Sequence, residues 1–152
     1  MSAYARENRG YKYLLTVIDI FSKFAWAVAK RSKNAEDLTV AMKYTLNLMQ
    51  KHGITLCSTF SNLKASICER FNRILKSKMW MKFSLWGHDR WLNLLSGLVS
   101  SYNNSRHRTI GMRPADVTAK NKKILPQRVF NNLKTKSTLN RSKFKVGKKI
   151  DN

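Results

Sequence analysis

The sequence predicts a mixed α/β domain with a basic C-terminal extension, and three observations lead to this prediction. Short β-rich runs lie near the N-terminus, helical periodicity fills most of the middle of the chain, and from Lys120 onward eleven basic residues face a single acid, Asp151. The chain has 152 residues, the length of one domain, and 43% of them are hydrophobic, enough to build a core.

Three strands are expected. The first covers residues 11–21 and has apolar side chains on both alternating faces, which is typical of a central strand covered on both sides. A two-residue polar break separates it from a second strand at residues 24–29, so the two should form a hairpin. A third short run, residues 54–60, is also rich in β-forming residues.

Three helices are also expected, and each has recognisable ends. The first begins after Asn34, which can cap it, and ends near Gly53. The second opens at Ser61 and runs through Met81, whereas the third begins at Asp89 and is apolar over most of its circumference. The buried stripe of the second helix is expected to contain Leu63, Ile67, Phe71, Leu75 and Met79. The following segment, residues 105–117, is expected to be a loop.

The charge of the chain is its strongest compositional feature. Thirty Lys and Arg residues stand against eight Asp and Glu, which gives a formal net charge of +22. Such a domain repels itself unless a polyanion neutralises it, so DNA or RNA is the leading expected partner and an anionic membrane surface a weaker one. No apolar run is long enough to span a membrane and the N-terminus resembles no signal peptide, so we expect an intracellular, nuclear protein.

The two cysteines are expected to be structural. Cys57 and Cys68 are each embedded among apolar residues, which favours buried, reduced thiols. His52 lies five positions before Cys57, but one His and one Cys do not make a zinc site.

Two of the eight carboxylates occupy positions that suggest chemistry. Asp19 lies inside the first strand, where an unpartnered carboxylate is costly, and Glu69 lies inside the second helix. Carboxylates held on rigid elements can bind the paired Mg²⁺ ions of phosphoryl transfer. The alternative is structural: Glu69 has Arg73 four positions on, the spacing of a surface ion pair, and Asp19 can sit at a strand end near Lys23. Spacing alone favours the structural alternative for Glu69.

Three separated stretches resemble one known family. In the right order, they look like the catalytic core of the retroviral integrase and DDE transposase superfamily, most closely the integrases of Maverick/Polinton-type transposons: YKYLLTVIDIFSKFAWAV (11–28), KASICERFNRILKSKMW (64–80) and SYNNSRHRTIGMRPADV (101–117). The resemblance implies a ribonuclease H-like mixed sheet with flanking helices in residues 1–118. It also implies, in residues 119–152, a basic linker and the first strand of an incomplete SH3-like barrel, because KFKVGKKI resembles the opening of that barrel.

The resemblance also implies residue roles. Asp19 matches the first metal-binding Asp of the family and Glu69 the last acid, so these two would bind Mg²⁺ or Mn²⁺ and act in catalysis. Asn72 matches the Asn of the E-x-x-N motif, and Arg73 and Lys76 lie on the same helical face, where relatives hold DNA. Further nucleic-acid contacts are expected from Lys64, Arg106 and Arg108. The signature that ends the core is matched by Tyr102, Asn103, His107 and Pro114.

One departure from the family is large. Its second catalytic Asp has no counterpart here, since the 31 residues from Leu38 to Cys68 contain no carboxylate. The sequence therefore resembles an internally deleted copy that lacks one central strand, one helix and that Asp, with the seam near Asn47. Compared with the family, the zinc-binding domain that usually precedes the core is also expected to be absent from this copy.

Three functions remain open on these grounds. The first, which the resemblance implies, is an integrase-type polynucleotidyl transferase by ancestry, with negligible strand transfer expected because two carboxylates rarely position two Mg²⁺ ions. The alternative is a non-enzymatic DNA- or RNA-binding protein domesticated from a transposon. The third is an unrelated basic protein that packs in a nucleoprotein particle. The resemblance also implies a homo-oligomer, as in related integrases.

The tryptophans near the basic groups have different expected roles. Trp80 and Trp86 are candidate base-stacking platforms, whereas Trp91 is expected in the core.

Overall fold

The computed structural model describes residues 4–54, 62–118, 121 and 125, with the backbone alone for residues 62–64. Two strands, three α-helices and one short 3₁₀ helix occupy these residues: β1 (Tyr13–Ile18), β2 (Ala25–Lys30), α1 (Ala35–Lys51), α2 (Asn62–Trp86), α3 (Trp91–Asn103) and η2 (Pro114–Asp116). The mixed α/β class expected from the sequence is therefore confirmed for the described residues. The predicted strand at residues 54–60 and nearly all of residues 119–152 lie outside them.

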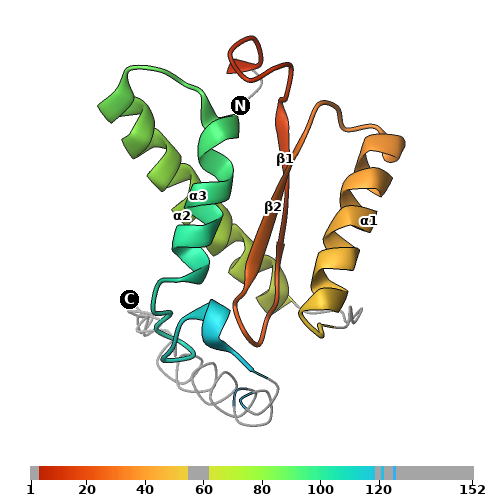
Figure 1. The fold of residues 1–152 in the computed structure, drawn as a ribbon, viewed down its shortest axis with the longest axis vertical. Coiled ribbons are helices and arrows are strands. Elements are labelled where there is room, and N and C mark those ends of the chain that lie inside the picture. Colours follow the sequence, from red (N-terminus) through yellow and green to blue (C-terminus); the bar gives the residue numbers. More distant parts are fainter. Residues whose placement is uncertain (1–3, 55–61, 119–120, 122–124, 126–152) are drawn as a thin grey trace, which may run out of the picture.

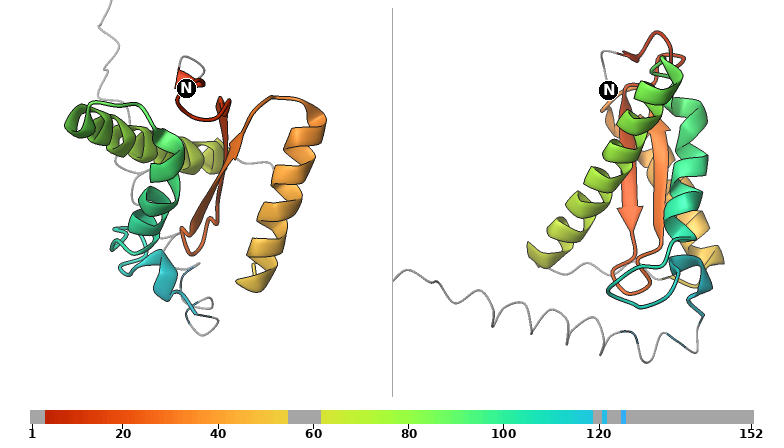
Figure 2. Two further views of the ribbon diagram at one scale, coloured as in Figure 1. Left: turned by 45° about the horizontal axis from the view of Figure 1, so that its top comes forward. Right: turned by 90° about the vertical axis from the view of Figure 1, so that its left-hand side faces the viewer.

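The two strands form the predicted antiparallel hairpin. Tyr13 pairs with Lys30 at its open end and Ile18 with Ala25 beside the turn. Figure 1 shows the hairpin between two groups of helices, with α1 on one face and α2 and α3 on the other, and both views in Figure 2 agree. Helices thus cover both faces of β1 as expected, although every residue of the strand is only half-buried. The sheet has two strands within the described part of the chain.

The core lies between the hairpin and the α2–α3 pair. Both helices contribute apolar side chains at intervals of three or four residues, which places them on one face of each helix. The buried members of this cluster are Ala25, Phe71, Leu75, Met79, Phe83, Trp91, Leu95, Leu98 and Tyr102. Three residues of the predicted stripe on α2 are among them, and Trp91, with 0% of its surface exposed, confirms the expectation that it belongs to the core.

The helix ends differ from the sequence predictions in three details. Asn34 precedes α1 but makes no side-chain capping bond. Instead the Asp37 carboxylate accepts hydrogen bonds from Ser32 N (3.0 Å) and Oγ (2.6 Å), which lowers the pKa of Asp37. α2 runs to Trp86 rather than Met81 because the apolar periodicity continues to Phe83, which is buried. α3 starts at Trp91, two residues after Asp89.

A side chain from α3 bonds the outer edge of β2. Asn103, which is 5% exposed, accepts a hydrogen bond from Ala25 N through Oδ1 (2.9 Å) and donates one from Nδ2 to Ala25 O (2.9 Å). These are the two bonds that a neighbouring strand would make, so the amide group satisfies the backbone of Ala25. The contact fixes the end of α3 against the turn that joins the two strands.

Candidate functional site

Asp19 organises the turn between β1 and β2. Its Oδ2 accepts hydrogen bonds from Ser22 N (2.9 Å) and Ser22 Oγ (2.5 Å), and its backbone bonds Phe24 O and Lys23 N. Short side-chain acceptors that bond a backbone two or three residues ahead are typical of tight turns. Asp19 is half-buried, and the hydrogen bonds from Ser22 satisfy its carboxylate. These bonds explain why a carboxylate stands at the end of an apolar strand. This arrangement matches the structural alternative weighed for it.

Lys23, in the same turn, is an unexpected part of the site. Its backbone has the left-handed φ of 61°, and its side chain is only 3% exposed. The pKa of Lys23 is lowered to about 8, mainly by burial; the Asp19 carboxylate opposes this shift and the nearby Arg70 adds to it. Sequence reasoning treated Lys23 as part of a polar break and as a neighbour of Asp19, and nothing in its spacing shows that helices will cover it.

The start of α2 packs beside the end of β1. Thr16 Oγ1 lies 3.7 Å from Cys68 Sγ, which brings the residue before Glu69 against the strand that ends at Asp19. The same part of α2 brings Arg70 near Lys23. The two acids singled out from the sequence therefore belong to the same region of the fold. Cys68 is a free, half-buried thiol rather than a fully buried one, and Cys57 lies outside the described residues.

Glu69 does not form the ion pair that its spacing suggested. Within the described side chains the one ion pair joins Arg113 to Asp116 (2.6 Å), so the expected Glu69–Arg73 pair is absent. Glu69, Arg73 and Lys76 are all exposed on α2. Asn72 is half-buried, with Nδ2 4.0 Å from Cys68 Sγ. The side chain of Lys64, another expected contact, lies outside the described residues.

The segment after α3 lies at the same end of the hairpin as the Asp19 turn (Figure 1). Arg106 donates from Nε to Gly111 O (3.0 Å), and Arg108 is exposed. His107 is half-buried, and burial together with the positive charges of Lys23 and Arg70 lowers its pKa. The predicted loop is thus tied to the turn and to α2, and its signature residues contribute to packing rather than to a ligand set.

Aromatic packing links α2, α3 and this loop. Tyr102 stacks edge-on with Phe71 (4.8 Å between ring centroids) and with His107 (6.4 Å), and burial raises the pKa of Tyr102 to about 12. Trp80 and Trp86 are about half exposed, at 54% and 51%. Both tryptophans lie in the C-terminal half of α2, well after the segment that packs beside Asp19.

The described residues do not by themselves make a two-metal site. No cluster of three or more His, Cys, Asp or Glu side chains occurs among them. One carboxylate oxygen of Asp19 already accepts hydrogen bonds from Ser22, and a pair of Mg²⁺ ions usually shares more protein carboxylates than Asp19 and Glu69. Within the described part of the chain, this donor set therefore does not fit a two-Mg²⁺ mechanism. What the region does offer is a concentration of positive charge from Lys23, Arg70 and the exposed basic residues of α2.

Comparison with known proteins gives one informative relative. The chain is 28% identical over 141 residues to a Caenorhabditis elegans protein named as transposon-derived, an alignment that covers 77% of this chain and 49% of the relative. The chain thus spans about half the length of that relative. No model of a known protein family matches the sequence. None of the helices that the structure describes is long and apolar enough to cross a membrane.

Proposed function

We propose that the chain is a nucleic-acid-binding domain of transposon origin, descended from an integrase-type core and without strand-transfer activity. The observation that carries the proposal is the net charge of +22, which is hard to reconcile with any partner other than a polyanion. The proposed phosphate contacts are the exposed basic residues Arg73 and Lys76 of α2, together with Arg108 in the loop at the Asp19 end of the hairpin.

Two findings support the transposon origin and the loss of activity. The relative in C. elegans carries the name of a transposon-derived protein. The alignment extends over 141 residues, but it includes only 77% of the 152 residues of this chain. The relative therefore has residues at aligned positions where this chain has none. An internal deletion of a strand, a helix and the second catalytic Asp is consistent with that difference. The hairpin with helices on both faces is what a shortened ribonuclease H-like core would retain.

Duplex DNA binding tests the proposal directly. Purified protein is titrated into two fluorescent 20-base-pair duplexes of unrelated sequence, and anisotropy is recorded from 50 to 300 mM salt. We expect equal affinity for the two sequences and a linear fall of log K with log salt concentration, because released counterions drive the binding. Arg73→Gln and Lys76→Gln should each reduce the slope by about 0.9. Lys43→Gln, an exposed site on α1, is the control that removes the same charge.

A second candidate function is residual strand transfer. It is favoured by one observation: Glu69 is exposed, does not pair with Arg73, and lies in the region of Asp19. Mg²⁺- or Mn²⁺-dependent joining of DNA ends that is lost in both Asp19→Asn and Glu69→Gln would establish this enzyme and refute the proposed inactivity. We expect no joining above background with either metal, while both variants still bind DNA.

The proposal also includes nuclear location and self-association in the manner of related integrases. Imaging tests the location, and sedimentation tests the self-association.

A further inference from the structure

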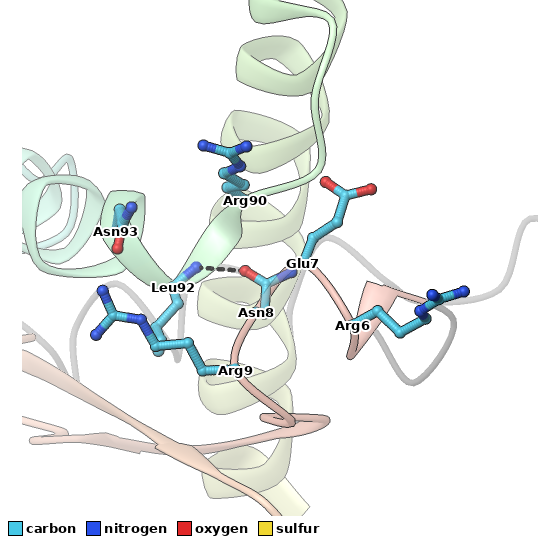
Figure 3. A pocket seen from close by; sticks show the side chains of 7 residues that line it. All are labelled: Arg6, Glu7, Asn8, Arg9, Arg90, Leu92 and Asn93. Atoms are coloured by element: carbon cyan, nitrogen blue, oxygen red, sulfur yellow. Dashed lines mark hydrogen bonds between the residues drawn. The ribbon is translucent and has the colours of Figure 1, made fainter.

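A cavity of about 340 Å³ lies at the end of the hairpin opposite the Asp19 turn. It is formed by the loop before β1 and the start of α3, which meet at the upper end of Figure 1. We call it the arginine pocket, and its lining includes Arg6, Glu7, Asn8, Arg9, Arg90 and the first turn of α3. Figure 3 shows Arg9 and Arg90 on either side of the helix start at Leu92, with Arg6 extending away from them.

Asn8 holds the two walls of the pocket together. Its side chain, 1% exposed, donates hydrogen bonds to Tyr4 O (2.8 Å) and Asp89 O (2.9 Å) and accepts one from Leu92 N (3.0 Å). A buried amide group that uses both its donor and its acceptor atoms fixes the loop rigidly against α3. The backbone positions of the neighbouring Arg9 and Arg90 are therefore fixed by these hydrogen bonds.

Arg9 adopts a backbone conformation that needs this support. Its φ of 53° lies in the left-handed region, which is unfavourable for a residue with a Cβ. The turn is closed around it by Gly10 N to Ala5 O (2.9 Å) and Tyr11 N to Asn8 O (2.9 Å). Glycine would adopt this conformation without strain, so the hydrogen bonds of the turn must hold Arg9 in it.

The charges in the pocket favour an anion. Three arginines line it with a single acidic residue, Glu7, whose Oε2 accepts a hydrogen bond from Asp89 N at 3.3 Å. None of these charged groups belongs to an ion pair in the part of the chain that the structure describes. Guanidinium groups present several N–H donors in a plane and bind phosphate oxygens in pairs. The volume of the cavity is ample for one phosphodiester group.

We propose that the arginine pocket binds a backbone phosphate of the same nucleic acid, as a second contact remote from the Asp19 end, mainly through Arg9 and Arg90. The proposal rests on the proposed function, because it assumes that DNA is bound. The six residues of β1 separate the two ends of the hairpin by roughly 20 Å at about 3.3 Å per residue, and roughly six base pairs of duplex cover that distance. A single duplex of ordinary length can therefore contact both ends.

The salt dependence of DNA binding tests the pocket with matched variants. Arg9→Gln and Arg90→Gln are each expected to reduce the slope of log K against log salt by about 0.9, and the double variant by about twice that, whereas Lys43→Gln leaves the slope unchanged. If wild-type protein binds DNA and both pocket variants behave like Lys43→Gln, the pocket proposal is overturned and the proposed function stands. If wild-type protein does not bind DNA, both are overturned.

A second pair of variants separates binding from folding. Arg9→Gly relieves the left-handed strain, so its melting temperature should equal or exceed that of the wild type while its DNA affinity falls. Arg9→Lys keeps the charge and should keep the salt slope. A stable Arg9→Gly variant with wild-type affinity would overturn the proposal. Titration with inorganic phosphate, monitored through the amide resonance of Leu92, distinguishes free phosphate from a nucleic-acid phosphate as the ligand. A shift of this resonance with phosphate, together with no contribution of Arg9 to DNA binding, would refute a nucleic-acid ligand.

Discussion

Lys23→Met is expected to stabilise the fold at neutral pH, because it removes a charge that the fold buries. The folded-state pKa of about 8, against 10.5 for an unburied lysine, corresponds to a cost of about 3 kcal/mol at pH 7. Methionine keeps an unbranched stem of similar length, so the packing around the turn is preserved. The variant should therefore gain up to about 3 kcal/mol in the free energy of unfolding.

The pH dependence of the wild type gives an independent measure of the same cost. Between pH 8 and 10 the folded chain has lost the Lys23 proton and the unfolded chain still holds it, so stability should rise with pH by about 2 kcal/mol. Above pH 10 the sign reverses, since Tyr102 has a folded-state pKa of about 12 and ionises first in the unfolded chain. The Lys23→Met variant should lack the rise between pH 8 and 10.

Urea denaturation at pH 7, 8, 9 and 10 measures both effects. Lys43→Met, at an exposed position on α1, removes one charge without relieving any burial and is the control for the overall repulsion among basic residues. The reasoning is refuted if Lys23→Met is no more stable than the control at pH 7. It is equally refuted if the variant keeps the alkaline rise of the wild type.

Three further substitutions test the contacts around the turn. Asn103→Leu should cost about 2–4 kcal/mol in urea denaturation, because both backbone groups of Ala25 lose their partner, and a cost below about 1 kcal/mol would contradict this role. Asp19→Ala should cost about 1–2 kcal/mol through the lost bonds to Ser22, again by denaturation; an unchanged midpoint would remove its role in the turn. Glu69→Gln should change stability by less than about 0.5 kcal/mol and tighten DNA binding in the anisotropy assay, because a negative charge beside the phosphate contacts is removed; weaker binding would count against that placement.

The parts of the fold that follow from local periodicity were predictable from the sequence. The polar break before Phe24 marks the hairpin turn, and the spacing of Phe71, Leu75 and Met79 identifies the buried face of α2. Both signals depend only on neighbours in the chain and on the repeat of a strand or helix. The length of α2 was underestimated because its periodicity was judged to stop before Phe83.

The parts that depend on distant packing were not predictable. Burial of Lys23 requires α2 and the loop after α3 to close over a turn, and nothing near Lys23 in the sequence encodes that. The bond between Asn103 and Ala25 joins residues 78 positions apart. For the candidate site, Arg73 and Lys76 were expected on one face of α2 and both are exposed, whereas the Glu69–Arg73 ion pair that the spacing favoured is absent. Side-chain partners on an exposed helix are set by small energies that spacing alone does not decide.

The clamp made by Asn8 also constrains how the chain can fold during synthesis. Its acceptor bonds Leu92 N, 84 residues later, so the contact between the loop before β1 and α3 cannot form until the start of α3 has been made. At typical elongation rates that wait lasts on the order of ten seconds. During this time the loop before β1 lacks its contact with α3, and a fragment ending before α3 should not protect the N-terminal residues from proteolysis. Completion of the fold thus depends on a contact that spans more than half of the chain.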